Sequence, residues 1–212
     1  MTGRLGVLGG TFDPIHYGHL DAAAAARESL SLDEVLFLPA HDQPLRTNDA
    51  SASGFHRFAM VTLAINGCPL YRVSDAELLR EGRSYTIDTL RHLHAEGWTA
   101  SQLFFILGAD AIAEIANWRG FPDILDAARF VVVARPGVIL DAAVARTPGL
   151  AARVSILEAR TRDVSSTAIR QRLAAGESVD DLVPAAVSRH ILAHHLYGTV
   201  DELHGEDERT RS

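Results

Sequence analysis

The chain has 212 residues, of which 47% are hydrophobic and 22% are charged, as expected for one globular α/β domain. Its formal net charge of −7 argues against a general nucleic-acid binder, because such a protein needs a cationic surface. The single cysteine, Cys68, excludes an intrachain disulfide and a zinc site built from several cysteines, and favours a reducing, cytoplasmic compartment. The short, glycine-rich apolar run at the start is unlike a signal peptide, and no segment approaches the ~20 apolar residues of a membrane helix.

Apolar runs of strand length alternate with segments of helical period. The expected elements, in chain order, are a strand at 5–8, a helix at 21–30, a strand at 35–38, helices at 55–65 and 85–94, strands at 103–107, 130–133 and 154–157, and helices at 167–174 and 184–194. Strands that are apolar throughout and separated by helices are typical of a parallel sheet covered on both faces.

Two polar segments, 39–54 and 135–149, lack a period and are predicted to be irregular, the first as a long functional loop. The predicted organisation is one domain over residues 1–197, including a small C-terminal helical part at 165–197. The remainder, 198–212, is a polar acidic tail: from Asp201 onward it holds five acids and two bases, so disorder is expected.

The first predicted strand leads into the sequence GGTFDPIHYGHL over residues 9–20. Gly9 and Gly10 let a phosphate approach the backbone closely, and the following helix start offers free amides and a positive dipole end. His16 and His19 are three residues apart, so on a helical turn they share a face and could stabilise charge during transfer. An ordinary turn with structural histidines is the alternative, as is a metal pair, although no third ligand is evident nearby. The glycines do not spell the G-x-G-x-x-G fingerprint.

The whole string resembles the signature of the nucleotidylyltransferases with a His-x-Gly-His motif, most closely that of the bacterial nicotinate mononucleotide adenylyltransferases. The resemblance implies an α/β fold with a doubly wound parallel sheet, a Rossmann-like nucleotidyltransferase fold, and ATP at the carboxyl ends of the strands, as in other open α/β sheets. It also implies ATP-binding roles for Gly9, Gly10, Thr11, Phe12, His16 and His19, with Thr11 touching the mononucleotide as well.

The sequence VSSTAIR over residues 164–170 is the second motif. Ser165 can cap a helix whose next amides are free to bind an anion. Arg170 lies four residues after Ser166, on the same face, where paired donors could hold a phosphate. Alone, a capped surface helix explains the pattern as well. Beside the first motif it resembles the family's Ser-Ser-Thr-x-x-Arg signature, which implies that Ser165, Ser166, Thr167 and Arg170 bind the ATP triphosphate.

The sequence RSYTIDTL over residues 83–90 resembles the Ser-Tyr-Thr-x-x-Thr-Leu element of the pyridine-nucleotide enzymes. Ser84 or Thr86 is expected to cap a helix whose first amides would receive the nicotinate carboxylate; an ordinary capped helix is the alternative. The resemblance implies that Ser84, Tyr85 and Thr86 bind the mononucleotide. Asp88 is the only acid expected to flank this element closely, and a helical turn should direct it elsewhere.

Three more matches lie farther along the chain. Gly108 and Asp110, which end the most apolar strand, resemble the family's Gly-x-Asp, whose acid contacts sugar hydroxyls of ATP. Trp118 matches the tryptophan that stacks on the pyridine ring, and the amide of Arg119 should lie near the carboxylate. Arg135 matches an ATP contact. A helix-capping Asp and a core Trp are the structural alternatives.

The loop after Pro39 departs from the family pattern. Where Pro-Pro-His-Lys is usual, this chain reads QPLR over residues 43–46. Arg46 keeps the cation and is expected to contact phosphate, although Arg and Lys differ in phosphate geometry. Leu45 replaces the His and has no assigned role.

The implied reaction transfers the AMP moiety of ATP to nicotinate mononucleotide, giving nicotinate adenine dinucleotide (deamido-NAD) and pyrophosphate, a step of NAD biosynthesis. The expected catalytic groups are His16, His19, Arg46 and Arg170, with Mg²⁺ carried by ATP and no metal ligand in the chain. The phosphate nucleophile is already an anion, so positioning and charge stabilisation suffice.

Three alternatives remain from the sequence. A sibling adenylyltransferase would act on nicotinamide mononucleotide, flavin mononucleotide or phosphopantetheine. A nicotinamide-dependent dehydrogenase would need the glycine fingerprint that is missing, and a nucleotide-binding sensor would need no catalysis. ATP and nicotinate mononucleotide are the expected partners, without nucleic acid or membrane, and a homo-oligomer stays open.

Overall fold

The computed structural model describes residues 3–41, 50–80, 82–136, 150 and 152–199. Six strands pair in parallel in the order β3-β2-β1-β4-β5-β6, which confirms the predicted doubly wound sheet. The strands are β1 (Leu5–Gly10), β2 (Glu34–Pro39), β3 (Tyr71–Val73), β4 (Leu103–Gly108), β5 (Arg129–Ala134) and β6 (Val154–Glu158). The helices are α1 (Tyr17–Leu30), α2 (Gly54–Ile65), α3 (Thr86–Ala95), α4 (Ala109–Ala113), α6 (Ser166–Ala174) and α7 (Ala185–Ala193), with short 3₁₀ helices η1 (Ile115–Asn117), η2 (Asp123–Asp126) and η3 (Leu196–Gly198).

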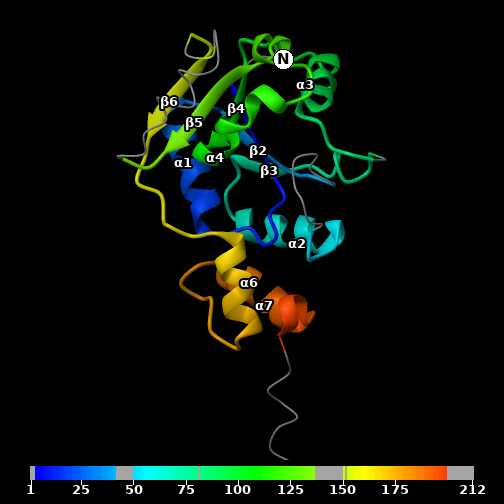
Figure 1. Cartoon of the computed structure of the whole chain (residues 1–212), viewed down its shortest axis with the longest axis vertical. Coiled ribbons are helices and arrows are strands. Elements are labelled where there is room, and N and C mark those ends of the chain that lie inside the picture. The colour runs from blue at the N-terminus through cyan, green and yellow to red at the C-terminus, as the bar shows by residue number, and fades with distance from the viewer. Residues whose placement is uncertain (1–2, 42–49, 81, 137–149, 151, 200–212) are drawn as a thin grey trace, which may run out of the picture.

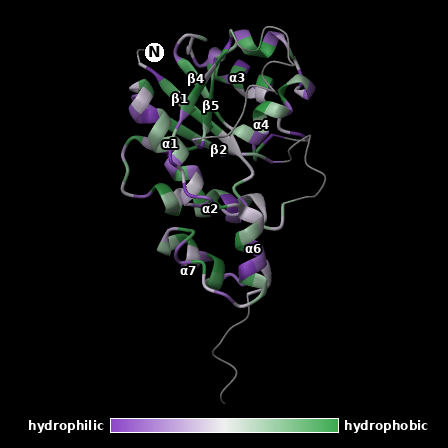
Figure 2. Cartoon of the chain, turned by 60° about the vertical axis from the view of Figure 1, so that its left-hand side comes forward, coloured by the Kyte–Doolittle hydropathy of each residue, from purple (hydrophilic) through white to green (hydrophobic). Residues whose placement is uncertain are grey.

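Two apolar clusters lie on opposite faces of the sheet because successive strand side chains point to opposite faces. On one face, Leu8 of β1 and Phe37 of β2 pack with α1, α2, α6 and α7. On the other, Val7 and Leu36 of the same strands pack with α3, α4, η1 and η2. Figure 2 shows the strands coloured as hydrophobic between these helices. Burial on both faces explains why the strands are apolar throughout.

The strand order reverses between β1 and β4, since β1 leads toward β2 and β3 while β4 leads toward β5 and β6. Ligands of open α/β sheets bind at the carboxyl ends of the strands beside such a reversal. Gly10 ends β1 and Gly108 ends β4, so the topology brings two of the sequence motifs to one edge.

The C-terminal helices α6 and α7 lie next to α2, beyond the sheet in Figure 1. The Ser166 hydroxyl of α6 donates to the Pro14 carbonyl at 2.9 Å, and the Tyr17 amide donates to the Leu182 carbonyl at 3.0 Å. These bonds tie the C-terminal helical part to the segment that follows β1. The predicted domain limits stay a prediction, and the tail from residue 200 lies outside the described residues.

Each predicted strand and helix is present, with three differences. Helix α1 begins at Tyr17, not residue 21, so the last four residues of the first motif are helical. Strand β3, an edge strand of three residues, and the five-residue helix α4 were not predicted, because segments this short give no clear period. Across the described ranges, no helix is long and apolar enough to cross a membrane.

Candidate active site

A cavity of about 720 Å³ opens at the carboxyl ends of β1 and β4. It is lined by residues of all three motifs and by the segment that follows β4. The predicted site residues that line it are Gly9, Gly10, Thr11, Phe12, His19, Ser84, Tyr85, Thr86, Asp110, Trp118, Arg119 and Ser166. One hollow therefore unites segments more than 150 residues apart in the sequence.

The turn after β1 has a tightly fixed backbone. Phe12 is buried at a φ of 50°, in the left-handed region that bulky residues rarely adopt and that is often found at functional sites. A Cβ on Gly10 would lie 3.1 Å from the Phe12 ring, so glycine at this position lets the ring fold back over the backbone. The ring edge then contacts His19, with centroids 5.0 Å apart.

The two histidines of the motif stack on each other, with ring centroids 3.7 Å apart. A Cβ on Gly18 would lie 3.1 Å from Nδ1 of His16, so the glycine between the two histidines makes room for this stack. The His16 amide donates to Nδ1 of His19 at 3.3 Å. In the neutral ring the remaining proton of His19 therefore lies on Nε2, which becomes a hydrogen-bond donor.

His16 and His19 differ in exposure to the cavity. His19 lines it, whereas His16 is only 6% exposed and lies behind its partner. Burial lowers the pKa of His16 to about 4, and burial with the neighbouring His16 lowers the pKa of His19 well below its ordinary value. Both rings are therefore neutral near pH 7, so they can act through hydrogen bonds and not as fixed charges.

Asp13, which the sequence analysis left without a role, is a buried junction of four segments. Its carboxylate accepts from the amides of Ser51 and Ala52 at 2.8 and 3.0 Å, and from the Tyr197 hydroxyl at 3.0 Å. Arg170 of α6 lies 3.7 Å from the same carboxylate. Burial, with the adjacent Asp13, strongly raises the pKa of Tyr197, so the hydroxyl remains a donor.

Arg57 is a buried cation that fixes two loops at the cavity edge. Its Nη1 donates to the carbonyls of Thr11 and Ala40, both at 2.7 Å, and its Nε donates to the Ala52 carbonyl at 3.2 Å. Its contacts place it as a support for the turn after β1 and for the loop after β2.

The second motif begins helix α6 as predicted. The Ser165 hydroxyl accepts from the amide of Ala168 at 3.1 Å and caps the helix. Arg170 does not line the cavity; its Nη1 donates to the Asp13 carbonyl at 2.8 Å and its Nη2 donates to the Thr167 hydroxyl at 3.3 Å. Of this motif, Ser166 alone lines the cavity.

The opposite end of the cavity is formed by the start of α3 and by Trp118. Tyr85 is the N-cap of α3 and makes no side-chain cap bond, so the predicted cap by Ser84 or Thr86 is wrong: the Ser84 hydroxyl instead accepts from the His41 amide at 3.0 Å. The edge of Trp118 meets Phe105, with ring centroids 6.0 Å apart at 89°. An aromatic side chain half-buried in this way can offer its face to a flat ligand.

Charges at this end of the cavity differ from the expectation. Asp88 does not line the cavity and lies 3.2 Å from Arg91 and 3.6 Å from Arg119. Glu77, however, is a buried acid that lines it, so Asp88 is not the only acid nearby. The Glu77 carboxylate accepts from the Thr89 hydroxyl at 2.5 Å. Burial raises the pKa of Glu77, which favours its neutral form.

Two further predicted residues, Gly108 and Arg135, fall outside the cavity lining. Gly108 ends β4 beside it. Arg135 pairs with Asp163 at 2.5 Å, just before the second motif. The loop position Arg46 lies outside the described residues, as does Leu45.

Known proteins are similar to this chain along most of its length. The cytidylyltransferase-like family model matches residues 7–172. A protein of Roseiflexus sp. (strain RS-1), named probable nicotinate-nucleotide adenylyltransferase, is 47% identical over 91% of this chain and 97% of its own length. A protein of Leifsonia xyli with the same name is 45% identical over 93% of this chain and 95% of its own length.

The fold has solved counterparts. The structure of Plasmodium falciparum nicotinic acid mononucleotide adenylyltransferase complexed with NaAD matches with a TM-score of 0.73. The match covers 92% of this chain and 98% of that one at 19% identity, which shows the shared fold. With the family model across most of its length and close relatives along nearly all of it, the chain belongs to the cytidylyltransferase-like family, among the nicotinate-nucleotide adenylyltransferases.

Proposed function

We propose that this protein transfers the adenylyl group of ATP to nicotinate mononucleotide, forming nicotinate adenine dinucleotide and pyrophosphate in NAD biosynthesis. The observation that carries the proposal is the cavity at the β1–β4 reversal, whose lining combines the turn after β1 with an aromatic side chain and a helix start. A dehydrogenase fingerprint is absent from the turn after β1, which reads GGTF.

ATP lies with its phosphates along the turn after β1. The Nε2–H of His19 points a neutral donor at the α/β-phosphate oxygens, where charge builds in the transition state. His16 supports that ring through the stack. Gly9, Gly10 and Phe12 shape the backbone, and the remaining ATP contacts are Gly108, Asp110, Arg135, Ser165, Ser166 and Thr167.

Arg170 reaches the outer phosphates from α6. Its guanidinium donates to the Asp13 carbonyl and to the Thr167 hydroxyl. Because a guanidinium has five N–H donors, these two bonds leave other donors for an anion. Arg46 adds a second cation from the loop after β2. Mg²⁺ carried by ATP would neutralise charge on the phosphates. The Asp13 carboxylate beside the turn is already bonded to protein donors, so we assign it no metal-binding role.

The chemical step is an in-line displacement at the α-phosphorus. A 5′-phosphate oxygen of the mononucleotide forms the new P–O bond while the bond from the α-phosphorus to the bridging oxygen breaks and pyrophosphate leaves. The attacking oxygen is already anionic, so no general base is required. The protein contributes positioning and charge stabilisation.

The pyridine ring stacks on Trp118, and its carboxylate faces the first amides of α3 and the amide of Arg119. Helix starts favour anions through free N–H groups and the dipole. Ser84, Tyr85, Thr86 and Thr11 complete the mononucleotide contacts. Burial raises the pKa of Glu77, which weakens the tendency of this acid to carry a negative charge beside the carboxylate.

Pyrophosphate release with ATP and a panel of mononucleotides tests the proposal. Nicotinate mononucleotide should support turnover, with flavin mononucleotide and phosphopantetheine inactive. His19→Ala should be nearly inactive, while His92→Ala, which removes an exposed histidine of α3, should retain full activity. Turnover with phosphopantetheine alone, or with no acceptor in the panel, would refute the assignment. We infer a cytoplasmic location, because a chain with a single cysteine suits a reducing compartment.

A further inference from the structure

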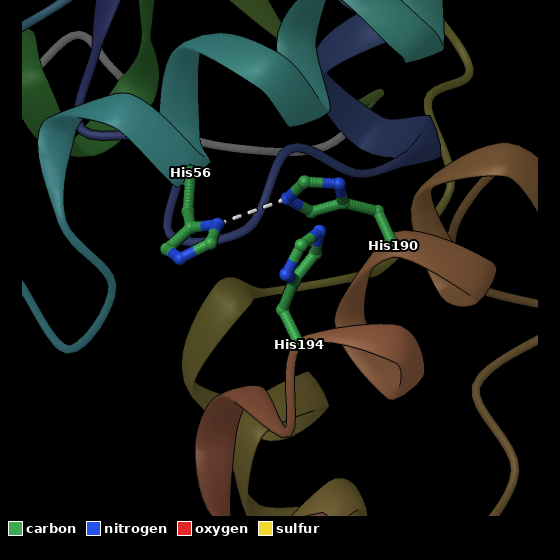
Figure 3. A group of neighbouring side chains, drawn as sticks. All are labelled: His56, His190 and His194. Atoms are coloured by element: carbon green, nitrogen blue, oxygen red, sulfur yellow. Dashed lines mark hydrogen bonds between the residues drawn. The ribbon is translucent and has the colours of Figure 1, made fainter.

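Three histidines meet between α2 and α7, away from the cavity (Figure 3). His56 lies in the first turn of α2, His190 lies in the last turn of α7, and His194 is the C-cap of α7. Within the described part of the chain, one ring nitrogen of each lies within 4.8 Å of the others. His56 Nδ1 and His190 Nε2 are 3.1 Å apart.

The arrangement is more than a single histidine pair. The ring of His194 lies 4.4 Å from that of His190 and 4.9 Å from that of His56, centroid to centroid, so all three rings are in mutual contact. His190 and His194 are four residues apart, which places both rings on one helical face. The third ring comes from a helix more than 130 residues away in the sequence.

The surroundings of His190 favour the form of imidazole that binds a metal. Burial lowers the pKa of His190, and the neighbouring His194 and His56 lower it further. The neutral imidazole is the form that ligates metals. In the metal-free state one of the two nitrogens 3.1 Å apart donates to the other; with a metal, that proton moves to the far nitrogen of its ring.

The distances suit a transition metal. Zn²⁺ with nitrogen ligands at 2.0–2.1 Å in tetrahedral geometry holds those nitrogens about 3.3–3.4 Å apart, close to the 3.1 Å between His56 and His190. His194 is exposed, so a rotamer change can close the remaining gap. A set of three imidazole ligands suits Zn²⁺ and other first-row transition metals such as Cu and Ni, whereas Mg²⁺ and Ca²⁺ need oxygen ligands.

We propose that His56, His190 and His194 form a zinc site, with water as the fourth ligand, that fastens α7 onto the start of α2. Its role is structural and separate from the Mg²⁺ that travels with ATP. His56 precedes Arg57, whose guanidinium holds the Thr11 and Ala40 carbonyls at the cavity edge. The metal therefore secures the helix turn on which that support rests.

The test is zinc titration into the tag-free full chain by isothermal calorimetry, after removal of metals with a chelator. One Zn²⁺ should bind per chain, and zinc at about a hundredfold above Kd should raise Tm by about 5–10 °C. Co²⁺ in place of zinc should give the visible d–d bands of a tetrahedral nitrogen site. Mg²⁺ should produce neither signal.

Matched variants separate the three-ligand site from weaker alternatives. Loss of a residue that only hydrogen-bonds to a metal ligand weakens metal binding about 10–100-fold. His56→Gln and His194→Gln each remove a ligand, so each should weaken zinc binding by more than this. His92→Gln, which removes an exposed histidine elsewhere, should bind zinc like the wild type. His194 is exposed, so the Tm of the metal-free His194→Gln variant should match that of the metal-free wild type. No one-to-one binding at micromolar zinc, or unchanged affinity in His56→Gln, would overturn the proposal.

Discussion

Lowering the pH is expected to destabilise the protein through His16. The side chain is buried at 6% exposure, and its pKa falls to about 4, against about 6.5 in the unfolded chain. Between these values the unfolded chain binds a proton that the folded chain does not. The free energy of unfolding therefore falls as the pH drops from 6.5 to 4, by about 3 kcal/mol once the pH reaches 4.

Urea unfolding at several pH values from 7.5 to 4 measures this effect. His16→Gln keeps a polar side chain of similar size but cannot take up the proton, so the wild type should lose about 3 kcal/mol more than the variant over this range. His92→Gln should follow the wild type closely, since that ring is half exposed. Parallel pH profiles for the wild type and His16→Gln would refute the argument that the stacked pair is held neutral by burial.

Three kinetic predictions follow from the site. His19→Ala should lower kcat by about 10²–10³, the usual cost of one preorganised donor, and unchanged turnover in a folded variant would remove His19 from the mechanism. Arg170→Ala should raise the KM for ATP about tenfold to a hundredfold with little change for the mononucleotide; equal effects on both substrates would mean that Arg170 mainly holds Asp13. Trp118→Ala removes the stacking surface, so it should lower the affinity for both pyridine mononucleotides without reversing the enzyme's preference between them. Steady-state kinetics with each mononucleotide would detect a reversal.

The parts of the molecule that could be predicted from the sequence are those encoded locally. Leu103–Gly108 is apolar because both faces of the sheet are covered, and the run is visible without its neighbours. Ser165 caps α6 through an amide three residues away. The gathering of the motifs into one cavity follows from parallel strands whose carboxyl ends share an edge.

What could not be predicted depends on contacts between distant segments. Asp13 bonds to Tyr197 across 184 residues, and the position of Glu77 in the cavity depends on how the chain after β3 folds onto α3. The expected cap by Ser84 is wrong for the same reason: its hydroxyl accepts a hydrogen bond from the distant His41 amide instead of capping α3. The histidine pair was expected to face phosphate together, yet burial of His16 behind His19 leaves one ring on the cavity.

Competition between the two pyridine mononucleotides tests the central claim most directly. With ATP saturating and nicotinate and nicotinamide mononucleotide equimolar, the ratio of the two dinucleotide products gives the ratio of kcat/KM. In the proposed site the start of α3 and the Arg119 amide offer donors to a carboxylate. An amide NH₂ would face these donors unpaired, so the acid product should dominate by orders of magnitude. Glu77→Gln, which keeps a polar side chain of the same size without its charge, should keep that preference. Equal products, or an excess of the amide product, would contradict the account.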